Sequence, residues 1–239
     1  MTFTDLTTGR VLGVVPGRDG AALTRWLLEQ PQWWCDGLEV IAIDPSAAFR
    51  SAIITNLPDA QITVDHFHLV KLANDMVTQV RRRVSWDRHD RRGRRIDAAW
   101  AHRGLLLRGY DTLSENGRAR LDQVLRHDDP TDEIGAAWGV KEQLRRILAC
   151  TDLDSAAVER TTFDEYVGWA AMAETTRLKR TIDRWWPHIE TFILTRVTNA
   201  KTEAANTTIK HIKRTGRGYR NHDNYACRIL ITSAARTAT

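Results

Sequence analysis

The chain has 239 residues, 42% hydrophobic and 27% charged, which is enough apolar material for a sizeable core. Six prolines and 14 glycines argue against a fibrous or disordered chain, and three well-separated cysteines without a CxxC pair argue against a structural zinc site or a disulfide scaffold. The net charge of +5 favours an anionic partner, although a mildly basic enzyme would have the same composition.

The first quarter of the chain predicts alternating strands and helices. Short β-branched or apolar runs predict strands, helical spacing predicts the segments between them, and Ser46 is a candidate helix cap. We therefore expect strands at 1–6, 11–15, 38–43 and 61–64, and helices at 20–30 and 47–56. This order indicates an α/β fold with a mixed sheet, in which 38–43 is buried on both faces.

From His68 the pattern becomes helical and continues to about Ile193. The segment 68–84 predicts a long amphipathic helix that runs into an arginine-rich stretch, which includes Arg81, Arg82 and Arg83. A helix at 201–214, a basic glycine-containing segment and a short closing helix complete the chain. No run of 18 apolar residues occurs and the first residues resemble no signal peptide, so we expect a cytoplasmic protein with no membrane partner.

Asp44 is the first candidate site residue, because it follows the predicted strand 38–43 directly. In open α/β sheets, ligands gather at the carboxyl ends of strands, where an acidic side chain can face a metal ion. The alternative is that Asp44 only caps the helix that follows.

Asp65 and His68 are the second candidates, and they follow the next strand. A separation of three residues brings the two side chains together on one helical turn. The pair could bind a metal ion or a phosphate, or Asp65 could orient His68. A helix-capping Asp with a nearby histidine is an equal alternative.

The helix at 201–214 carries the third candidate site on one polar face. Glu203 and Asn206 lie at its start, and no acidic residue follows Glu203 until Asp223. A cluster of positive charges without acidic neighbours destabilises the fold unless an anion binds to it, and a phosphate backbone is the obvious anion. The cations of this stretch are Lys210, Lys213, Arg214, Arg217 and Arg220.

Two separated carboxylates beside basic patches suggest a hard divalent cation such as Mg²⁺. Paired ions of this kind activate water or a 3′-hydroxyl and stabilise a leaving oxygen in phosphodiester chemistry. Neither a P-loop nor an HExxH motif is present, so the sequence gives no support for an NTPase or a zinc hydrolase.

Two blocks of sequence resemble the DDE transposases of bacterial insertion sequences, in the ISL-three (ISL3) family. They are VIAIDPSAAFRSAI with LPDAQITVDHFHLVKLANDMVTQVRRRV, and NAKTEAANTTIKHIKRTGRGYRNHDNYACRIL. The resemblance implies an RNase H-like core interrupted by a helical insertion. It implies core segments at 1–67 and 196–239, and the insertion at 68–195. It also implies DNA cleavage and strand transfer at element ends, with Mg²⁺ or Mn²⁺ and a possible homo-oligomer on nucleoid DNA.

The same resemblance implies roles for individual residues. Asp44 matches the second catalytic carboxylate and metal ligand, and Glu203 matches the third. Asp65, His68 and Asn206 match supporting positions near the active site. The basic segment from Lys210 to Arg220 would lie against DNA. From their charge, we also expect Arg81, Arg82 and Arg83 to bind DNA.

The chain departs from the family pattern at its start. The family's first catalytic aspartate lies on a strand ahead of the one that MTFTDLTTGRVLG resembles, and Asp5 does not match it. The resemblance therefore implies an incomplete core without its first strand, in a truncated copy with impaired catalysis. The alternative is a non-catalytic DNA-binding remnant that pairs with, or inhibits, a full-length transposase.

Overall fold

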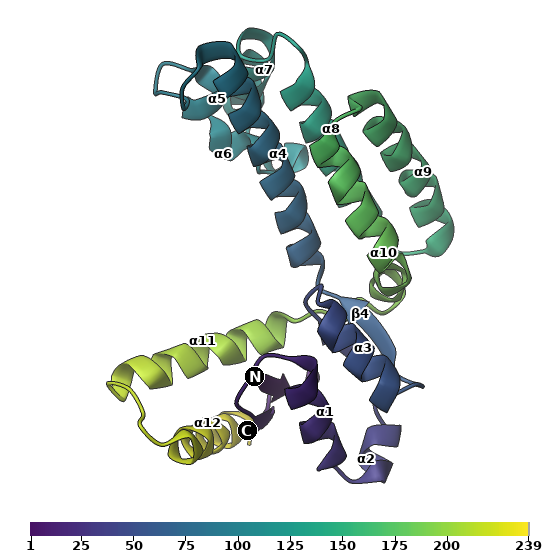
Figure 1. The fold of residues 1–239 in the computed structure, drawn as a ribbon, viewed down its shortest axis with the longest axis vertical. Coiled ribbons are helices and arrows are strands. Elements are labelled where there is room, and N and C mark those ends of the chain that lie inside the picture. Colours follow the sequence, from purple (N-terminus) through teal and green to yellow (C-terminus); the bar gives the residue numbers. More distant parts are fainter. Residues whose placement is uncertain (239) are drawn as a thin grey trace. The chain divides into compact units, whose positions relative to one another are not determined.

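The structure, a computed structural model, describes residues 1–238. The chain forms two compact units, of which the first consists of Met1–Asp65 and the chain from Thr195, and the second is His66–Leu194. Every strand in the described chain belongs to the first unit, and the second unit is helical (Figure 1).

Four short strands of the first unit form two separate pairs. β1 (Thr2–Thr4) and β2 (Val11–Val14) pair antiparallel, and β3 (Val40–Ile43) and β4 (Gln61–Val64) pair in parallel. Within residues 1–238 no strand pairing joins the two sheets. The mixed α/β class is therefore confirmed, whereas the single sheet is replaced by two pairs. Since β3 has one paired neighbour, its first three residues are only half-buried, unlike the expectation of burial on both faces.

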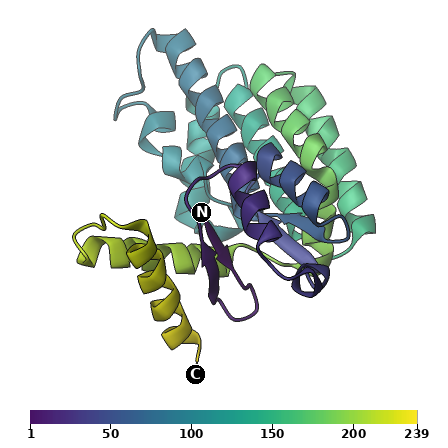
Figure 2. The ribbon, with the colours of Figure 1, turned by 60° about the horizontal axis from the view of Figure 1, so that its bottom comes forward.

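The β1–β2 hairpin (purple in Figure 2) is shaped by the side chain of Asp5. Its carboxylate accepts hydrogen bonds from the Thr7 amide and the Thr8 hydroxyl, both at 2.7 Å, which lowers the Asp5 pKa. Gly9 then adopts a φ of +80°, which glycine permits at little cost. The hydrogen bonds of the Asp5 side chain thus stabilise the turn between β1 and β2.

Three helices follow the hairpin or separate the strands, and each begins where the local sequence provides a start. Asp19 caps α1 (Gly20–Leu28), and Ser46 caps α3 (Ala47–Asn56) as predicted. The short α2 (Gln32–Asp36) begins after Pro31. α1 packs on α3, and its Trp26 stacks on Phe3 of β1 with ring centroids 3.7 Å apart.

The end of the chain returns to the first unit as α11 (Ala200–Thr215) and α12 (His222–Thr237). α12 packs against β2, and the Ser233 hydroxyl accepts the outward-facing amide of Val11 at 2.8 Å. This contact satisfies a backbone group on the outer edge of the hairpin. Val11, Ile212 and Ile229 form a small core beneath it.

The second unit begins with α4 (His66–His89), which extends two residues earlier and five later than the predicted helix. Helices of this unit end just before Asp128 and again just before Cys150. The remaining elements are α5 (Ala98–Ala101), α6 (Arg103–Leu106), the 3-10 turn η1 (Tyr110–Thr112), α7 (Glu115–His127), α8 (Glu133–Ala149), α9 (Leu153–Ala170) and α10 (Ala173–Thr195).

The core of the second unit follows the helical period. α4 packs on α8 and α8 packs on α9, so α8 is covered on two sides. Residues spaced by three and four along these helices are buried, for example Val77 and Val80 on α4 and Leu144 and Ile147 on α8. This unit therefore has a hydrophobic core of its own.

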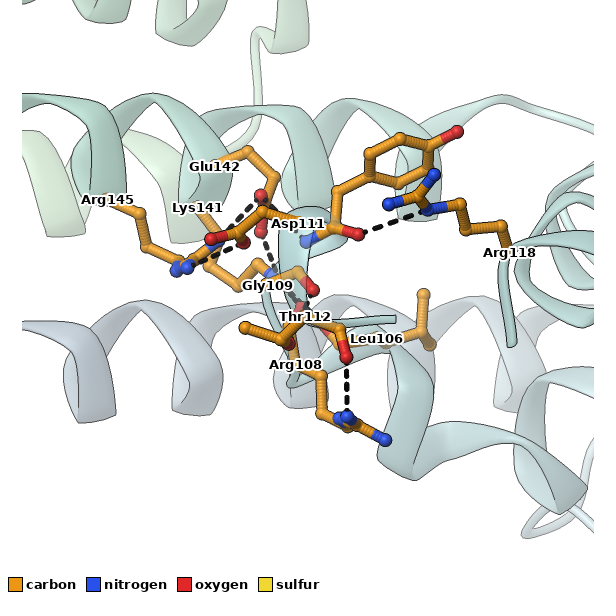
Figure 3. Close-up of polar contacts among 10 residues, drawn as sticks. Leu106, Arg108, Gly109, Asp111, Thr112, Arg118, Lys141, Glu142 and Arg145 are labelled. Carbon is orange, nitrogen blue, oxygen red and sulfur yellow. Dashed lines mark hydrogen bonds and ion pairs between the residues drawn. The ribbon is translucent and has the colours of Figure 1, made fainter. Parts of the chain in front are cut away.

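A buried polar network ties the turn before α7 to α8 (Figure 3). Lys141 is 0% exposed, and its ammonium group donates to the carbonyls of Leu106 at 2.8 Å and Arg108 at 2.7 Å. It also pairs with Glu142 at 2.8 Å. Arg145 pairs with both Glu142 and Asp111 at 2.9 Å. The buried Lys141 ammonium group therefore has two hydrogen-bond acceptors and one ion-pair partner.

Candidate functional site

The carboxyl ends of β3 and β4 bring two aspartates together. Ile43 pairs with Val64 in the parallel register, so Asp44 and Asp65 are the next residues on neighbouring strands. The amide of Asp65 donates to the carbonyl of Ile43 at 3.0 Å, which extends the pairing to that point. A carboxylate oxygen of Asp44 and one of Asp65 lie within 4.8 Å of each other. Two acidic side chains thus meet at the sheet edge where ligands gather in α/β folds.

The two aspartates differ in their exposure to solvent. Asp44 is exposed, whereas Asp65 is 1% exposed. His68 lies on the first turn of α4, three residues after Asp65, and offers a ring nitrogen within 4.8 Å of the Asp65 carboxylate. The predicted proximity of Asp65 and His68 is therefore present, and it follows from the helical turn that joins them.

Asn199 is a third polar group at Asp44, and no motif in the sequence singles it out. Its side-chain amide donates to Oδ1 of Asp44 at 3.0 Å, and the residue is 7% exposed. Asn199 occupies the N-cap position of α11, the helix that carries Glu203. The signal available in the sequence was a capping residue type four positions before the candidate glutamate.

Glu203 lies in the first turn of α11, and its side chain is exposed. Its amide donates to the carbonyl of Asn199 at 2.9 Å, one helical turn away. The group of close ligand atoms formed by the described residues does not include Glu203. Asn206, half-buried, lies three residues further along the same helix. Asp44 is therefore directly beside Asp65, and it connects to the Glu203 helix through Asn199.

The predicted DNA-binding arginines of α4 are in three different situations. Arg81 is 6% exposed, and burial lowers its pKa together with the charges of Arg82 and Arg103. Arg83 pairs with Glu133 at 2.8 Å and Glu174 at 2.9 Å, and the hydrogen bond to Glu174 raises its pKa. Arg82 is exposed. Arg81 is thus buried and Arg83 is paired with two acidic side chains, whereas Arg82 is exposed as contact with a phosphate requires.

A second group of cations is arranged differently, and we call it the basic tract. Its members lie on the last two turns of α11 and in the turn after it, and all five are exposed. In the part of the chain that the structure describes, none of them forms an ion pair with an acidic side chain. The basic tract consists of Lys210, Lys213, Arg214, Arg217 and Arg220.

The turn at the end of α11 gives the basic tract its shape. Arg217 and Gly218 both have positive φ values, 53° and 95°, which reverse the chain after the helix. The ring of Tyr219 packs against Gly216 and stacks on Tyr225 with centroids 4.8 Å apart. The cations are therefore displayed on an ordered turn.

Comparison with known protein families gives a match over most of the chain. The model of the ISL3-type DDE transposases, described as a transposase, matches residues 1–229. The chain belongs to this transposase family. The predicted resemblance is thereby confirmed, and with it the assignment to the transposases of insertion sequences.

An individual relative agrees with the family assignment. The transposase for insertion sequence element IS1001 from Bordetella parapertussis is 27% identical over 226 residues, which cover 92% of this chain and 53% of the relative. The chain thus spans about half the length of that curated relative. No solved structure matches this transposase-family chain. None of its described helices has the length and apolar character needed to cross a membrane.

Proposed function

We propose that this chain provides the catalytic part of an insertion-sequence transposase and acts on DNA by DDE-type cleavage and strand transfer. The first unit would be an RNase H-like core made of 1–67 and 196–239, and the helices of 68–195 an insertion in it. The proximity of Asp44 and Asp65 at the carboxyl edge of β3 and β4 carries the proposal. Such a protein would work on nucleoid DNA in the cytoplasm, as a homo-oligomer at the element ends.

The residues at this edge suit a hard divalent cation. Mg²⁺ and Mn²⁺ prefer carboxylate oxygens, and Asp44 and Asp65 offer two of them within 4.8 Å. Asp44 would be the exposed ligand, Asp65 the buried one, and Glu203 would approach from α11. His68 and Asn206 would support the site. A bound ion would stabilise negative charge on the phosphodiester and activate the attacking hydroxyl group.

The basic tract supports DNA as the substrate. Five exposed cations without acidic partners repel one another, and a phosphate backbone relieves that repulsion. The tract follows Glu203 on the same helix, so a strand bound along it would lead toward the first turn of α11. Arg82 is a further candidate contact, whereas Arg81 is buried and Arg83 is paired with Glu133 and Glu174.

The experiment is a Mn²⁺-dependent nicking assay on supercoiled DNA that carries insertion-sequence ends. Asp44→Asn and Glu203→Gln should abolish nicking, because each removes a charged ligand, and should change DNA affinity by less than about threefold. Asp59→Asn is the matched control, since Asp59 is exposed just before β4, at the opposite edge of the sheet. Nicking that survives in both carboxylate variants would overturn the catalytic assignment.

The basic tract alone would also serve a second function. A non-catalytic DNA-binding protein that pairs with, or inhibits, a full-length transposase needs the cations but not the carboxylates. It would bind DNA in a salt-sensitive manner, show no nicking with either metal ion, and behave identically in Asp44→Asn.

A further inference from the structure

The side chain of Asn199 makes a hydrogen bond that is unusual for a residue at a helix N-cap. An asparagine at a helix N-cap ordinarily accepts a hydrogen bond from an amide in the first turn. At the start of α11 that bond is absent, and the Asn199 amide instead donates to Oδ1 of Asp44 at 3.0 Å. The residue forgoes the usual capping bond and is buried while it contacts a carboxylate 155 positions away.

The effect of this bond falls on the orientation of Asp44. The Asp44 side chain is exposed to solvent. A donor from a buried residue on Oδ1 restricts the rotation of the carboxylate. A hydrogen bond to a ligating group commonly fixes ligand orientation in this way.

The backbone of Asn199 connects to the other predicted carboxylate. Its carbonyl accepts the amide of Glu203 at 2.9 Å. Two residues earlier, the carbonyl of Val197 accepts the Thr63 hydroxyl of β4 at 3.4 Å. The segment just before α11 is therefore attached to β4 at one point and to the end of β3 at another, so the first turn of α11 has a fixed start.

We propose that Asn199 is a positioning residue for the metal-binding carboxylates, which orients Asp44 through its side chain and anchors the Glu203 turn through its carbonyl. This role rests on the proposed function, because it requires that Asp44 binds a divalent cation. Asn199 itself touches neither the ion nor the DNA.

The test measures Mn²⁺ affinity of the full chain from the electron paramagnetic resonance signal of free Mn²⁺. Asn199→Ala should raise the Kd about tenfold, within the range seen when an outer partner of a metal ligand is lost. Asn199→Ser is the second variant, because serine caps a helix well but is too short to reach Asp44. It should raise the Kd similarly while α11 keeps its start, as judged by circular dichroism.

Asn56→Ala is the matched control for a merely structural loss. The Asn56 amide also joins two elements of the first unit, donating to the Thr24 hydroxyl of α1 at 3.1 Å and to the Ala52 carbonyl at 2.7 Å. Its loss should lower the melting temperature but leave the Mn²⁺ Kd within about twofold. In the double variant Asp44→Asn with Asn199→Ala, binding should be no weaker than in Asp44→Asn alone, since Asn199 acts through Asp44.

The outcomes separate the two ideas. If Asp44→Asn loses Mn²⁺ while Asn199→Ala and Asn199→Ser retain the wild-type Kd, the role of Asn199 is overturned and the proposed function stands. If Asp44→Asn itself binds Mn²⁺ like the wild type, the metal-dependent function is overturned first.

Discussion

The buried ammonium group of Lys141 donates hydrogen bonds to two backbone carbonyls and forms an ion pair with the carboxylate of Glu142. Burial lowers the pKa of this lysine, and the pairing with Glu142 acts against that shift. A buried charge is stable only when its polar partners are present. Removing the charge leaves those partners buried without a counterpart, which destabilises the fold. At the scale of single residues, the second unit thus contains a lysine that works as a structural clamp.

Lys141→Met should destabilise the chain by about 2–4 kcal/mol, because Glu142 and the Leu106 and Arg108 carbonyls lose their partner. The measurement is urea unfolding followed by circular dichroism. Lys71→Met is the control, since Lys71 and its partner Asp75 are both exposed and such pairs contribute less than about 1 kcal/mol. An equal effect of the two substitutions would contradict the clamp.

Asp97 provides a prediction about pH. Its carboxylate accepts both Nη groups of Arg91, at 2.7 and 3.0 Å, and the Arg94 amide at 2.6 Å, and these bonds hold its pKa far below the ordinary value. A lowered pKa in the folded state stabilises the fold above the unfolded value of about 3.9, and this stabilisation is lost as the pH falls below it.

The stability difference between the wild type and Asp97→Asn should therefore be largest near pH 7 and shrink steadily below pH ~4. Thermal melting of both proteins from pH 7 to pH 2.5 would show it. A difference that stays constant over this range would mean that the charge of Asp97 is not what stabilises the turn.

At the scale of elements, close packing limits the hairpin more than its sequence suggests. The indole of Trp26 lies directly over Gly13, where a Cβ atom would collide with Nε1 of the ring. The ring also stacks on Phe3, so it has little room to move. The absent side chain of Gly13 thus allows α1 to pack on β2.

Gly13→Ala should destabilise the first unit by about 1–3 kcal/mol through overpacking. Gly168→Ala in α9 is a suitable comparison, because a Cβ atom there meets nothing within 4 Å. It should stabilise its helix by about 0.5–1 kcal/mol, as expected for alanine replacing glycine in a helix. Urea titrations of both variants test the pair of predictions.

The basic tract leads to a prediction about salt. Lys213→Ala and Arg217→Ala should each reduce the slope of log K against log [salt] for DNA binding by about 0.9 if each cation neutralises one phosphate. Fluorescence anisotropy with duplex DNA between 50 and 200 mM salt measures the slope. Arg25→Ala, at an exposed position of α1 outside the tract, should leave the slope unchanged. An unchanged slope in all three variants would remove the tract from the DNA interface.

The elements that local sequence specifies were predictable, and the contacts between distant segments were not. The four strands and the Ser46 cap follow from periodicity and residue type over a few positions. The state of Arg83 does not, because its partner Glu174 lies 91 positions further along the chain. For the same reason a run of arginines looks like a DNA-binding surface until its acidic partners are known.

The candidate site shows the same division. Asp44 and Asp65 could be predicted as neighbours, since two consecutive parallel strands end at one edge. The contact between Asn199 and Asp44 could not, because it depends on how the chain returns to the first unit after residues 66–194. The position of Glu203 relative to the two aspartates depends on that same return.

Because the two units have separate cores, we expect a destabilising substitution in one unit to leave the stability of the other unchanged. Lys141→Met acts within the second unit, so it should accelerate amide hydrogen exchange in α6 and α8 while β1 and β2 exchange as in the wild type. Hydrogen exchange followed by mass spectrometry resolves these segments. Faster exchange throughout both units would show that they unfold as one cooperative body.

The hydrogen bond between Thr63 and Val197 has a further consequence. It joins the first unit just before the chain leaves at Asp65 and just after it returns at Thr195. The ends of the intervening segment are thus held together by the first unit itself, and loop-closure entropy grows so slowly that doubling the length of a flexible segment costs only about 0.6 kcal/mol. Residues 66–194 could therefore be lengthened, shortened or exchanged for another self-contained module with little penalty to the fold that carries Asp44 and Glu203.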